Sequence, residues 1–321
     1  MPDSPLSQGQ GQGRGPVPHR APPLVLRGRQ VGAAAPAIMA IVNRTTDSFY
    51  AGARQFDDGA ALAAVELALT EGAEIVDIGG VRAGTGPEVT SAEEIRRIVP
   101  FVERVRAEFP ELLVSVDTWR SEVAREAVGV GADLLNDTWA GHDPTLVEVA
   151  GELGVGVVCS HTGGAAPRTD PFRVSYPLAP GSPAGTDPRD GVIQSVLATL
   201  AAAAQRALDC GVARESILVD PTHDFGKNTW HSLHLVRSTG RLVDLGFPVL
   251  MALSRKDFVG ETLDLPADER LEGTLAATAV AAWLGAAVFR AHDVRSTRRV
   301  LDMTAAIRSD LAPARVLRGI E

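Results

Sequence analysis

Polar and charged residues follow short apolar runs along most of this sequence. They stand where the runs end: Asn43, Asp117, Asn136, Asp137, His161, Asp220, Arg255, Lys256, Arg290, His292 and Asp293. These are the side-chain types that bind polar ligands through hydrogen bonds and charge. A single Asp or Asn after a strand is more often a turn or helix-cap residue. Their recurrence at so many ends favours one shared site.

Other polar residues fit a structural role better. Asp77 lies inside the apolar run Ile75-Val76-Asp77-Ile78, so we expect a buried, hydrogen-bonded residue rather than a catalytic one. His223, His231 and His234 are the histidines whose clustering could suggest a metal site. Two of them are three residues apart in a predicted helix and no third ligand is evident, which argues against metal binding by these histidines.

The apolar runs must position these side chains. There are eight of them: Ala37 to Val42, Ile75 to Ile78, Leu112 to Val116, Asp133 to Leu135, Val155 to Cys159, Ser216 to Val219, Val249 to Leu253 and Ala287 to Phe289. Short apolar runs of this kind are typical of strands buried in a parallel sheet.

Stretches with helical periodicity separate the runs. Ser91 and Glu94 form a capping-box pair, which predicts a helix start. Val192 to Leu208 and Leu271 to Leu284 are two further predicted helices. The best-patterned helix has apolar residues on one face, at Ile95, Ile98, Val102, Val105 and Phe109.

Strand and helix alternate eight times over about 270 residues, as a β/α barrel requires. We therefore predict an α/β fold, a single eight-fold β/α (TIM) barrel, with an open doubly wound sheet as the alternative. A barrel gathers the carboxyl ends of its strands at one face, where the polar residues would meet. The segment Thr162 to Arg189 has many Pro, Gly, Asp and Arg residues and is predicted to be a long surface loop over that face.

Composition narrows the class of ligand. The 321 residues include 40 acidic and 31 basic side chains, giving a formal net charge of -9. No run of Lys or Arg stands out, so we expect no nucleic-acid partner, and a small-molecule substrate fits better. The two cysteines, Cys159 and Cys210, form no CxxC or metal-spaced pair, which is consistent with a reducing cytoplasm.

The amino-terminal segment differs from the rest. Residues 1–23 are rich in Gly, Gln, Pro and Ser and contain no apolar core like that of a signal peptide, so we predict a disordered tail. The apolar stretches farther along are broken before membrane length, and we expect no membrane partner. Residues 24–321 are expected to form one domain.

The strand ends resemble, in family order, the motifs of dihydropteroate synthases. They are Ile41-Val42-Asn43-Arg44-Thr45-Thr46-Asp47-Ser48-Phe49, Asp77-Ile78-Gly79-Gly80, Ser115-Val116-Asp117-Thr118, Asn136-Asp137, Asp220-Pro221 with Asp224-Phe225-Gly226-Lys227, Ser254-Arg255-Lys256, and Arg290-Ala291-His292-Asp293-Val294. The resemblance runs from about Ala37 to Arg308. As a set the motifs are highly specific, although each alone would be weak.

The resemblance implies a pterin site. Enzymes of this family condense 6-hydroxymethyl-7,8-dihydropterin diphosphate with p-aminobenzoate and release diphosphate. A pterin presents N–H donors and a carbonyl along one edge, which carboxylates and an amide suit. By resemblance, the pterin-binding residues are Asp117, Asn136, Asp220, Phe225 and Lys256, and the catalytic ones among them are Asp117, Asp220 and Lys256.

The resemblance also assigns the remaining parts of the site. Asn43, Arg290 and His292 match the residues that hold diphosphate, and Asn43 the one that contacts a magnesium ion. Asp257 and Arg255 fall in the region that receives p-aminobenzoate. The family further implies a homodimer, formed through the last helices.

Departures from the family pattern concentrate in two loops and beside the acceptor. Arg44 and Thr46 stand where Val and Pro are usual, and Tyr50-Ala51-Gly52-Ala53 replaces a Ser-Asp-Gly-Gly end. The second loop reads Val81-Arg82-Ala83-Gly84-Thr85-Gly86 and lacks the usual Thr and Arg. We expect these two loops not to close into an ordered lid.

Three single departures lie near the predicted pocket. Ala252 replaces a Gly, Ser160 a Met, and Asp257 a Ser. Asp257 would bring a second negative charge beside the carboxylate of p-aminobenzoate, unless it only caps its helix. The pattern resembles the divergent second copy that some bacteria carry, which is regarded as lacking ordinary synthase activity.

The leading hypothesis is therefore a homologue that binds a pterin and condenses it weakly or not at all. One alternative is an active synthase in which Arg44 or Arg82 replaces the lost loop Arg. Another is a non-catalytic binding or regulatory protein. A pterin-dependent methyltransferase is disfavoured, because its methyl donor carries no diphosphate for the Arg255 and Arg290 motifs to bind.

Overall fold

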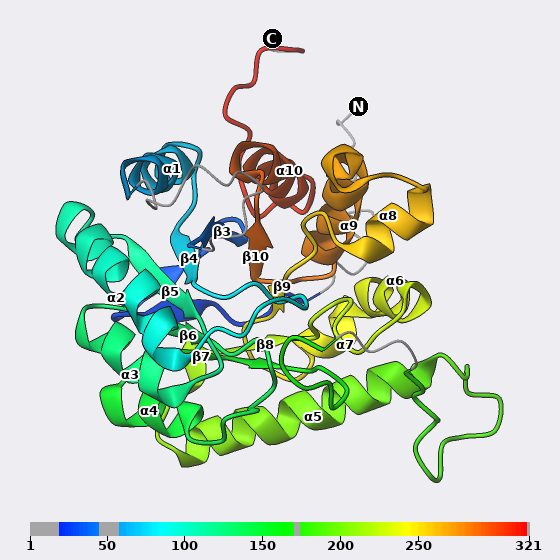
Figure 1. Cartoon of the computed structure of the whole chain (residues 1–321). Helices are drawn as coiled ribbons and strands as arrows, with labels where there is room; N and C mark the ends of the chain where they lie inside the picture. Colours follow the sequence, from blue (N-terminus) through cyan, green and yellow to red (C-terminus); the bar gives the residue numbers. More distant parts are fainter. Residues whose placement is uncertain (1–18, 45–57, 170–173, 320–321) are drawn as a thin grey trace, which may run out of the picture.

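Eight parallel strands form a nearly closed barrel with helices around it (Figure 1). The computed structural model describes residues 19–44, 58–169 and 174–319. The barrel strands are β3 (Ala37–Asn43), β4 (Ile75–Gly79), β5 (Leu113–Asp117), β6 (Leu134–Asn136), β7 (Gly156–Ser160), β8 (Ile217–Asp220), β9 (Leu250–Met251) and β10 (Val288–Ala291). The predicted fold class is confirmed.

The strands pair in the order β8-β7-β6-β5-β4-β3-β10-β9, all in parallel. One bridge, between Val219 of β8 and Val249, joins the two ends of this order. The Val219 N–H also donates to the carbonyl of Pro248 at 2.9 Å. The ring is thus closed at its last joint by a single bridge.

Ten α-helices are present in the described residues and connect the strands. They are α1 (Asp58–Thr70), α2 (Ser91–Glu108), α3 (Ser121–Gly129), α4 (Leu146–Leu153), α5 (Asp190–Asp209), α6 (Thr229–Arg237), α7 (Thr239–Val243), α8 (Asp257–Leu263), α9 (Leu271–Trp283) and α10 (Val294–Ile307). Short 3₁₀ turns cover Arg214–Ser216 and Ala267–Glu269. α5 is long and apolar enough to cross a membrane by composition, but one face of it packs into the barrel's core.

The predicted strands agree with the observed ones to within about two residues, and most are shifted by one toward the carboxyl end. The shift has a simple cause, because the polar residue that ends a run is itself paired in the sheet. Asp117 pairs with Asn136, and Ser160 pairs with Asp220. The strand ladder therefore holds the backbone of several site residues directly.

The helix start predicted at Ser91 and Glu94 is wrong in detail. The N-cap is Thr90, whose side chain accepts from the Glu93 N–H, and Ser91 is the first helical residue. Glu94 is fully buried and forms an ion pair with Arg120. A tertiary partner thus takes the carboxylate that a capping box would have used.

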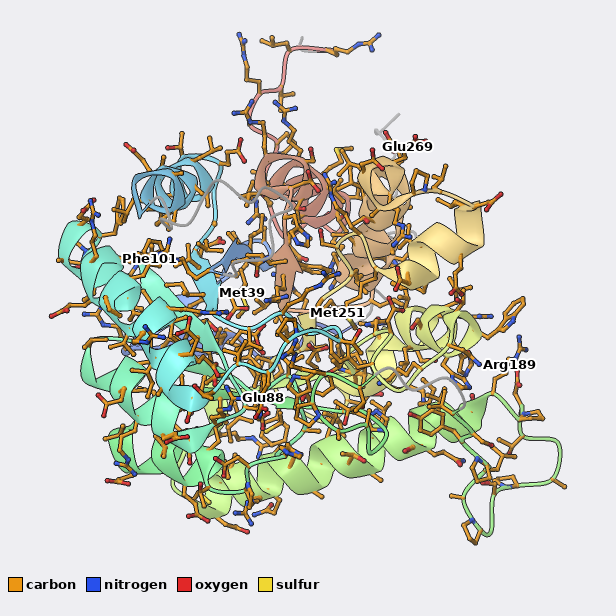
Figure 2. The ribbon with its side chains drawn as sticks, in the orientation of Figure 1. Met39, Glu88, Phe101, Arg189, Met251 and Glu269 are labelled. Atoms are coloured by element: carbon orange, nitrogen blue, oxygen red, sulfur yellow. The ribbon has the colours of Figure 1, made fainter. Side chains whose placement is uncertain are left out.

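A short antiparallel hairpin closes the amino end of the barrel. It consists of β1 (Leu24–Leu26) and β2 (Arg29–Val31). Its apolar side chains pack in one buried cluster with the first residues of the barrel strands, among them Met39, which lies near the middle of the molecule in Figure 2. Sequence reasoning placed this segment in the domain without predicting the hairpin.

The described chain begins inside the segment predicted as a tail. Ala21 is 9% exposed, and its N–H donates to the carbonyl of Gly285 at 2.8 Å. Residues 1–18, the rest of that segment, lie outside the described residues. The segment predicted as a long surface loop, Thr162 to Arg189, lies between β7 and α5. Its described residues contain no helix or strand, as expected for a loop.

Candidate functional site

An arginine and two aspartates form the centre of the barrel's carboxyl end. Arg290 is on β10, and its Nε donates to Oδ2 of Asp77 at 2.6 Å. Its Nη2 donates to Oδ2 of Asp117 at 2.9 Å. The guanidinium thus joins β10 to β4 and β5, and the predicted diphosphate-binding residue is in direct contact with a predicted pterin-binding one.

Asp77 is fully buried and hydrogen-bonded, as the sequence predicted, yet it belongs to this centre. Its Oδ1 accepts from the Ser115 hydroxyl at 2.6 Å, and its Oδ2 accepts from Nδ2 of Asn136 at 3.0 Å. Asp77 therefore fixes the amide of Asn136 as well as Arg290. With its nitrogen turned to Asp77, the Asn136 amide has its oxygen left for a ligand donor.

The carboxyl of Asp117 is in an unusual electrostatic position. Burial raises its pKa to about 7, with Asp77 acting in the same direction and Arg290 opposing it. Its Oδ1 also accepts from the Thr138 hydroxyl at 3.0 Å. A carboxyl with this pKa changes its charge near neutral pH and can both accept and release a proton there.

A second group of site residues surrounds Lys256. Asp220 is 5% exposed, and burial raises its pKa, while Lys256, Lys227 and Arg290 act in the opposite direction. The Lys256 ammonium lies 4.4 Å from the centre of the Phe225 ring and donates to the carbonyl of His223 at 2.6 Å. The predicted residues Asp220, Phe225 and Lys256 are thus brought together.

Sequence reasoning missed the part played by Lys227. This lysine is 7% exposed, and its ammonium donates to three carbonyls, those of His161, Thr222 and Phe225, at 2.7, 3.1 and 2.9 Å. Three donated hydrogen bonds require the protonated form, although burial lowers its pKa. Lys227 therefore positions Phe225 by holding the loop after β8 against the end of β7.

The loop after β8 contains two residues in a backbone conformation that is usually adopted by glycine. Thr222 and Asp224 have φ of 52° and 70°, and a β-branched residue with positive φ is strained. The Thr222 N–H donates to Asp220 at 2.7 Å, and its hydroxyl accepts from the His161 N–H at 3.3 Å. These bonds stabilise the strained turn and keep Asp220 in place.

His223, in the same loop, is completely buried without a partner for its ring. Neither ring nitrogen has a hydrogen-bond partner within the described chain, and the ring lies 5.6 Å from that of Phe258. Burial lowers its pKa well below the usual value, and Lys256 and Lys227 add to the effect. The imidazole is therefore neutral, and no hydrogen bond in the protein offsets the free-energy cost of removing its ring nitrogens from water.

We expect His223→Phe to raise the free energy of unfolding by about 1 kcal/mol, because an apolar ring needs no hydrogen-bond partner in this place. Chemical denaturation monitored by circular dichroism measures the change. The control is His142→Phe, the same substitution at an exposed histidine. A loss of stability in His223→Phe alone would mean that the imidazole has a bound partner.

The other two predicted diphosphate residues, Asn43 and His292, lie on β3, which pairs with the strand of Arg290, and in the loop that follows the strand of Arg290. His292 is exposed and its Nδ1 is 3.0 Å from the Ser254 hydroxyl. Asn43 ends β3, and its Oδ1 and Oδ2 of Asp117 each lie 3.8 Å from the position that a Cβ on Gly79 would take. The missing side chain leaves room between two oxygen atoms, the ligand type that Mg²⁺ takes together with phosphates.

The two residues predicted for the acceptor region point to other partners. Arg255 makes a bidentate pair with Asp293, at 3.0 and 2.8 Å. Asp257 is the first residue of α8, borders a cavity beside Phe225, and pairs through Oδ1 with Arg270 at 2.8 Å. It does not cap α8, whose N-cap is Lys256.

The altered loops are described in part. Residues 45–57, which contain most of the first loop, lie outside the described residues, and the expected failure of the two loops to close stays a prediction. Arg44 is buried, with its guanidinium 4.5 Å from the Phe101 ring of α2. In the second loop, Arg82 is exposed and borders the cavity beside Phe225.

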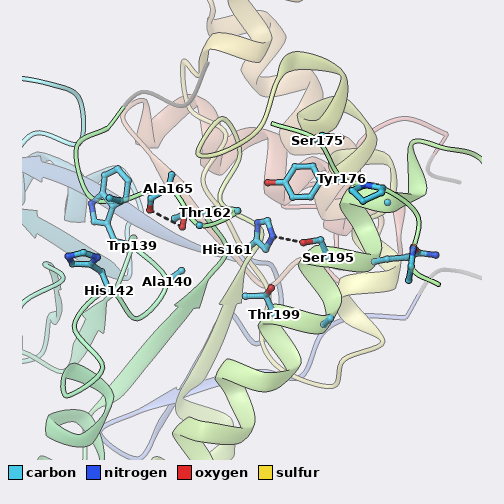
Figure 3. A pocket seen from close by; sticks show the side chains of 18 residues that line it. Trp139, Ala140, His142, His161, Thr162, Ala165, Ser175, Tyr176, Ser195 and Thr199 are labelled. Atoms are coloured by element: carbon cyan, nitrogen blue, oxygen red, sulfur yellow. Dashed lines mark hydrogen bonds between the residues drawn. The ribbon is translucent and has the colours of Figure 1, made fainter. Parts of the chain in front are cut away.

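Two other strand-end residues lie outside this centre. Asp137 accepts from the N–H groups of Trp139 and Gly141, so it stabilises a turn. His161 faces α5, where its Nε2 is 3.1 Å from the Ser195 hydroxyl (Figure 3). Burial lowers the pKa of His161 to about 3, with Lys227 adding to the effect, so the ring is neutral beside its cavity of about 730 Å³.

Several known proteins are similar to this chain in sequence. A family model described as "Pterin binding enzyme" matches residues 39–292. The chain is 57% identical to the "Inactive dihydropteroate synthase 2" of Mycobacterium leprae, over 92% of this chain and 99% of the relative. It is 38% identical to the dihydropteroate synthase of Haemophilus influenzae, over 83% of this chain and 92% of the relative.

A solved structure shows the same fold. The dihydropteroate synthase of Xanthomonas albilineans, determined with 4-aminobenzoic acid, is 34% identical and superposes with a TM-score of 0.76. The match covers 90% of this chain and 99% of that one.

Proposed function

The chain belongs to the dihydropteroate synthase family, and we propose that it binds a reduced pterin at the carboxyl end of its barrel while catalysing the usual condensation weakly or not at all. The observation that carries the proposal is the group Asp117, Asn136 and Asp220, with Lys256 and Phe225 beside it. Asp117, Asn136 and Asp220 end the strands β5, β6 and β8, and Phe225 and Lys256 lie in the loops that follow β8 and β9.

Each residue of this group has a chemical task in the proposed complex. Asp117 and Asp220 accept N–H groups of the pterin, and the Asn136 oxygen accepts another. Lys256 donates to a ring nitrogen or carbonyl, after leaving the His223 carbonyl that it contacts here. Phe225 is held by Lys227 and offers an apolar edge to the flat ligand.

The diphosphate of a donor pterin would lie between Asn43, Arg290 and His292. Arg290 has one guanidinium nitrogen, Nη1, without a protein acceptor among the described residues, and it can face a phosphate oxygen. Asn43 would hold a Mg²⁺ that arrives with the diphosphate, and the ion would neutralise charge on the leaving group.

The relatives named inactive and the altered second loop support the proposal of weak condensation. Isothermal titration with 6-hydroxymethyl-7,8-dihydropterin, with its diphosphate and Mg²⁺, and then with p-aminobenzoate tests each half of the site. Complementation of a synthase-deficient strain separates the active alternative. Absence of pterin binding by the folded protein would refute the proposal.

Pterin affinity should fall as the pH is lowered from about 8 to about 6, because the pKa of Asp117 is raised to about 7. Below that pH the free protein carries the protonated carboxyl, which must lose its proton to accept ligand N–H groups. The dissociation constant should therefore rise by up to about tenfold per pH unit below about 7. Asp117→Asn should bind weakly with a flatter profile, and an unchanged profile in this variant would assign the titration elsewhere.

We also propose a homodimer formed through the last helices. α6, α8, α9 and α10 border an apolar depression of about 770 Å³. Val280, Trp283 and Ile307 are 46%, 37% and 60% exposed on this face. A contiguous apolar surface of this kind is typical of an interface between copies.

Val280→Asp is expected to convert the dimer to a monomer, since it buries a charge in the apolar interface. The mass from light scattering measures the result. Leu67→Asp, at a residue 52% exposed on α1, is the control and should remain dimeric. A wild-type protein that is monomeric at micromolar concentration would contradict the proposal.

A further inference from the structure

A small cavity with a mixed aromatic and acidic wall lies beside the proposed pterin site. It has a volume of about 280 Å³, and its lining includes Arg82, Thr85, Trp139, Asp224, Phe225 and Asp257. An engineered cavity of about 150 Å³ holds benzene, so one aromatic ring fits here. Phe225 borders both this cavity and Lys256, which places the cavity next to the bound pterin.

Two aromatic rings provide a surface suited to a flat ligand. Trp139 and Phe225 are packed edge to face, with centroids 5.0 Å apart and planes at 71°. Trp139 is 4% exposed, so its position is fixed by the surrounding structure. Such ring pairs attract aromatic ligands, and their faces also favour cations.

Asp224 places a fixed negative charge in the wall. Its Oδ2 accepts from the N–H groups of Asp257 and Phe258, at 2.7 and 3.4 Å, and its Oδ1 accepts from the Ser232 hydroxyl at 3.1 Å. These donors prevent the carboxylate from rotating away. They are all uncharged, and among the described residues the charge of Asp224 acts on the ammonium groups of Lys256 and Lys227 without forming an ion pair with either.

Asp257 differs from Asp224 in its ion pairing and in its exposure to solvent. Its carboxylate is paired with Arg270 at 2.8 Å, and its side chain is 76% exposed. Solvent and the arginine therefore screen most of its charge. The sequence suggested Asp257 as the group that repels an acidic acceptor, whereas the geometry gives Asp224 the larger effect.

This cavity is lined by Asp257 and so falls in the acceptor region that the family resemblance assigns; we propose that Asp224 makes it select a neutral or cationic aromatic amine over an anionic one. The inference rests on the proposed pterin site. An anionic ring substituent would lose its hydration and be repelled by the Asp224 carboxylate, whereas an uncharged amide or a cation would meet no such repulsion. Arg82 provides the opposing charge, but it is exposed and no described residue holds it toward the cavity.

Three ligands of nearly the same shape test the selection. 4-Aminobenzoate, 4-aminobenzamide and 4-aminobenzamidine carry one negative charge, none and one positive charge at neutral pH. Each is titrated by calorimetry into the full chain with 6-hydroxymethyl-7,8-dihydropterin, diphosphate and Mg²⁺ present. We expect the benzoate to bind at least about tenfold more weakly than the amide, and the amidine at least as tightly.

Asp224→Asn removes the charge and retains a residue that tolerates positive φ. The benzoate should gain about tenfold in affinity, and the amide should change little. The matched control is Asp264→Asn, since Asp264 also has a positive φ, of 55°, and lies at the other end of α8, away from the lining. Its affinity ratios should equal those of the wild type.

Several results would overturn the inference. They are tightest binding of the benzoate to the wild type, equal affinities across the series, loss of benzoate binding in Arg82→Ala, and an unchanged ratio in Asp224→Asn. If Asp224→Asn does not fold, the wild-type series still decides. Binding of the pterin without any of the three amines would refute the cavity as the amine site, while failure of the pterin itself to bind would refute the proposed function instead.

Discussion

Replacing Arg290 by alanine is expected to lower the free energy of unfolding by about 3 to 5 kcal/mol. The guanidinium is the ion-pair partner of Asp77, which is fully buried, and of Asp117. Removal leaves an uncompensated carboxylate inside the barrel, where solvent cannot reach it. Denaturant unfolding followed by circular dichroism measures the loss.

Two further variants identify the cause of this loss. Asp77→Asn added to Arg290→Ala should restore part of the stability, because the amide carries no charge and can still bond to Ser115 and Asn136. Arg255→Ala also removes two arginine–carboxylate hydrogen bonds, here both to Asp293 and in a partly exposed position, and should cost about 1 kcal/mol or less. Equal losses for Arg290→Ala and Arg255→Ala would argue against the buried charge as the cause.

The second large effect is on ligand binding. Asp220→Ala should weaken pterin binding by about 1.5 to 3 kcal/mol, roughly 10- to 150-fold, since a nearly buried carboxylate that accepts from the ligand is lost. Asp220→Asn should lose less, because it keeps one acceptor. Isothermal titration with 6-hydroxymethyl-7,8-dihydropterin provides the affinities.

Asp137 supplies the matched control for Asp220. It also follows a barrel strand and is 7% exposed, but its carboxylate accepts from the turn N–H groups of Trp139 and Gly141. Asp137→Asn should therefore leave the pterin affinity unchanged, even if the protein is less stable. Unchanged affinity in Asp220→Ala would reject the assignment of Asp220 to the pterin.

The strands and much of the site could be predicted because one rule connects them. Buried parallel strands are apolar throughout, so the first polar residue marks both the strand end and the barrel's carboxyl face. This identified Asp117, Asn136, Asp220 and Arg290. The same rule assigned Asp77 to structure alone, because a residue inside an apolar run gives no sign that its side chain meets Arg290.

The remaining features depend on backbone conformation that residue types conceal. Thr222 and Asp224 take positive φ although neither is glycine, so the sequence does not show which residues of the loop adopt this conformation. The contacts of Lys227 with three carbonyls and of Asp224 with α8 follow from that turn. The β1–β2 hairpin was missed because its strands have only three residues each, too few for a period to be read.

The single bridge that joins β8 to Val249 makes the barrel a ring with one weak joint. Asp220 ends the strand on one side of this joint, and Lys256 follows the strand on the other. A ligand held by both side chains would connect the two edges where the sheet itself hardly does. Binding would then be coupled to closure of the ring. In the empty protein β8 and β9 would separate transiently at this joint, and in the occupied protein this separation would be rarer.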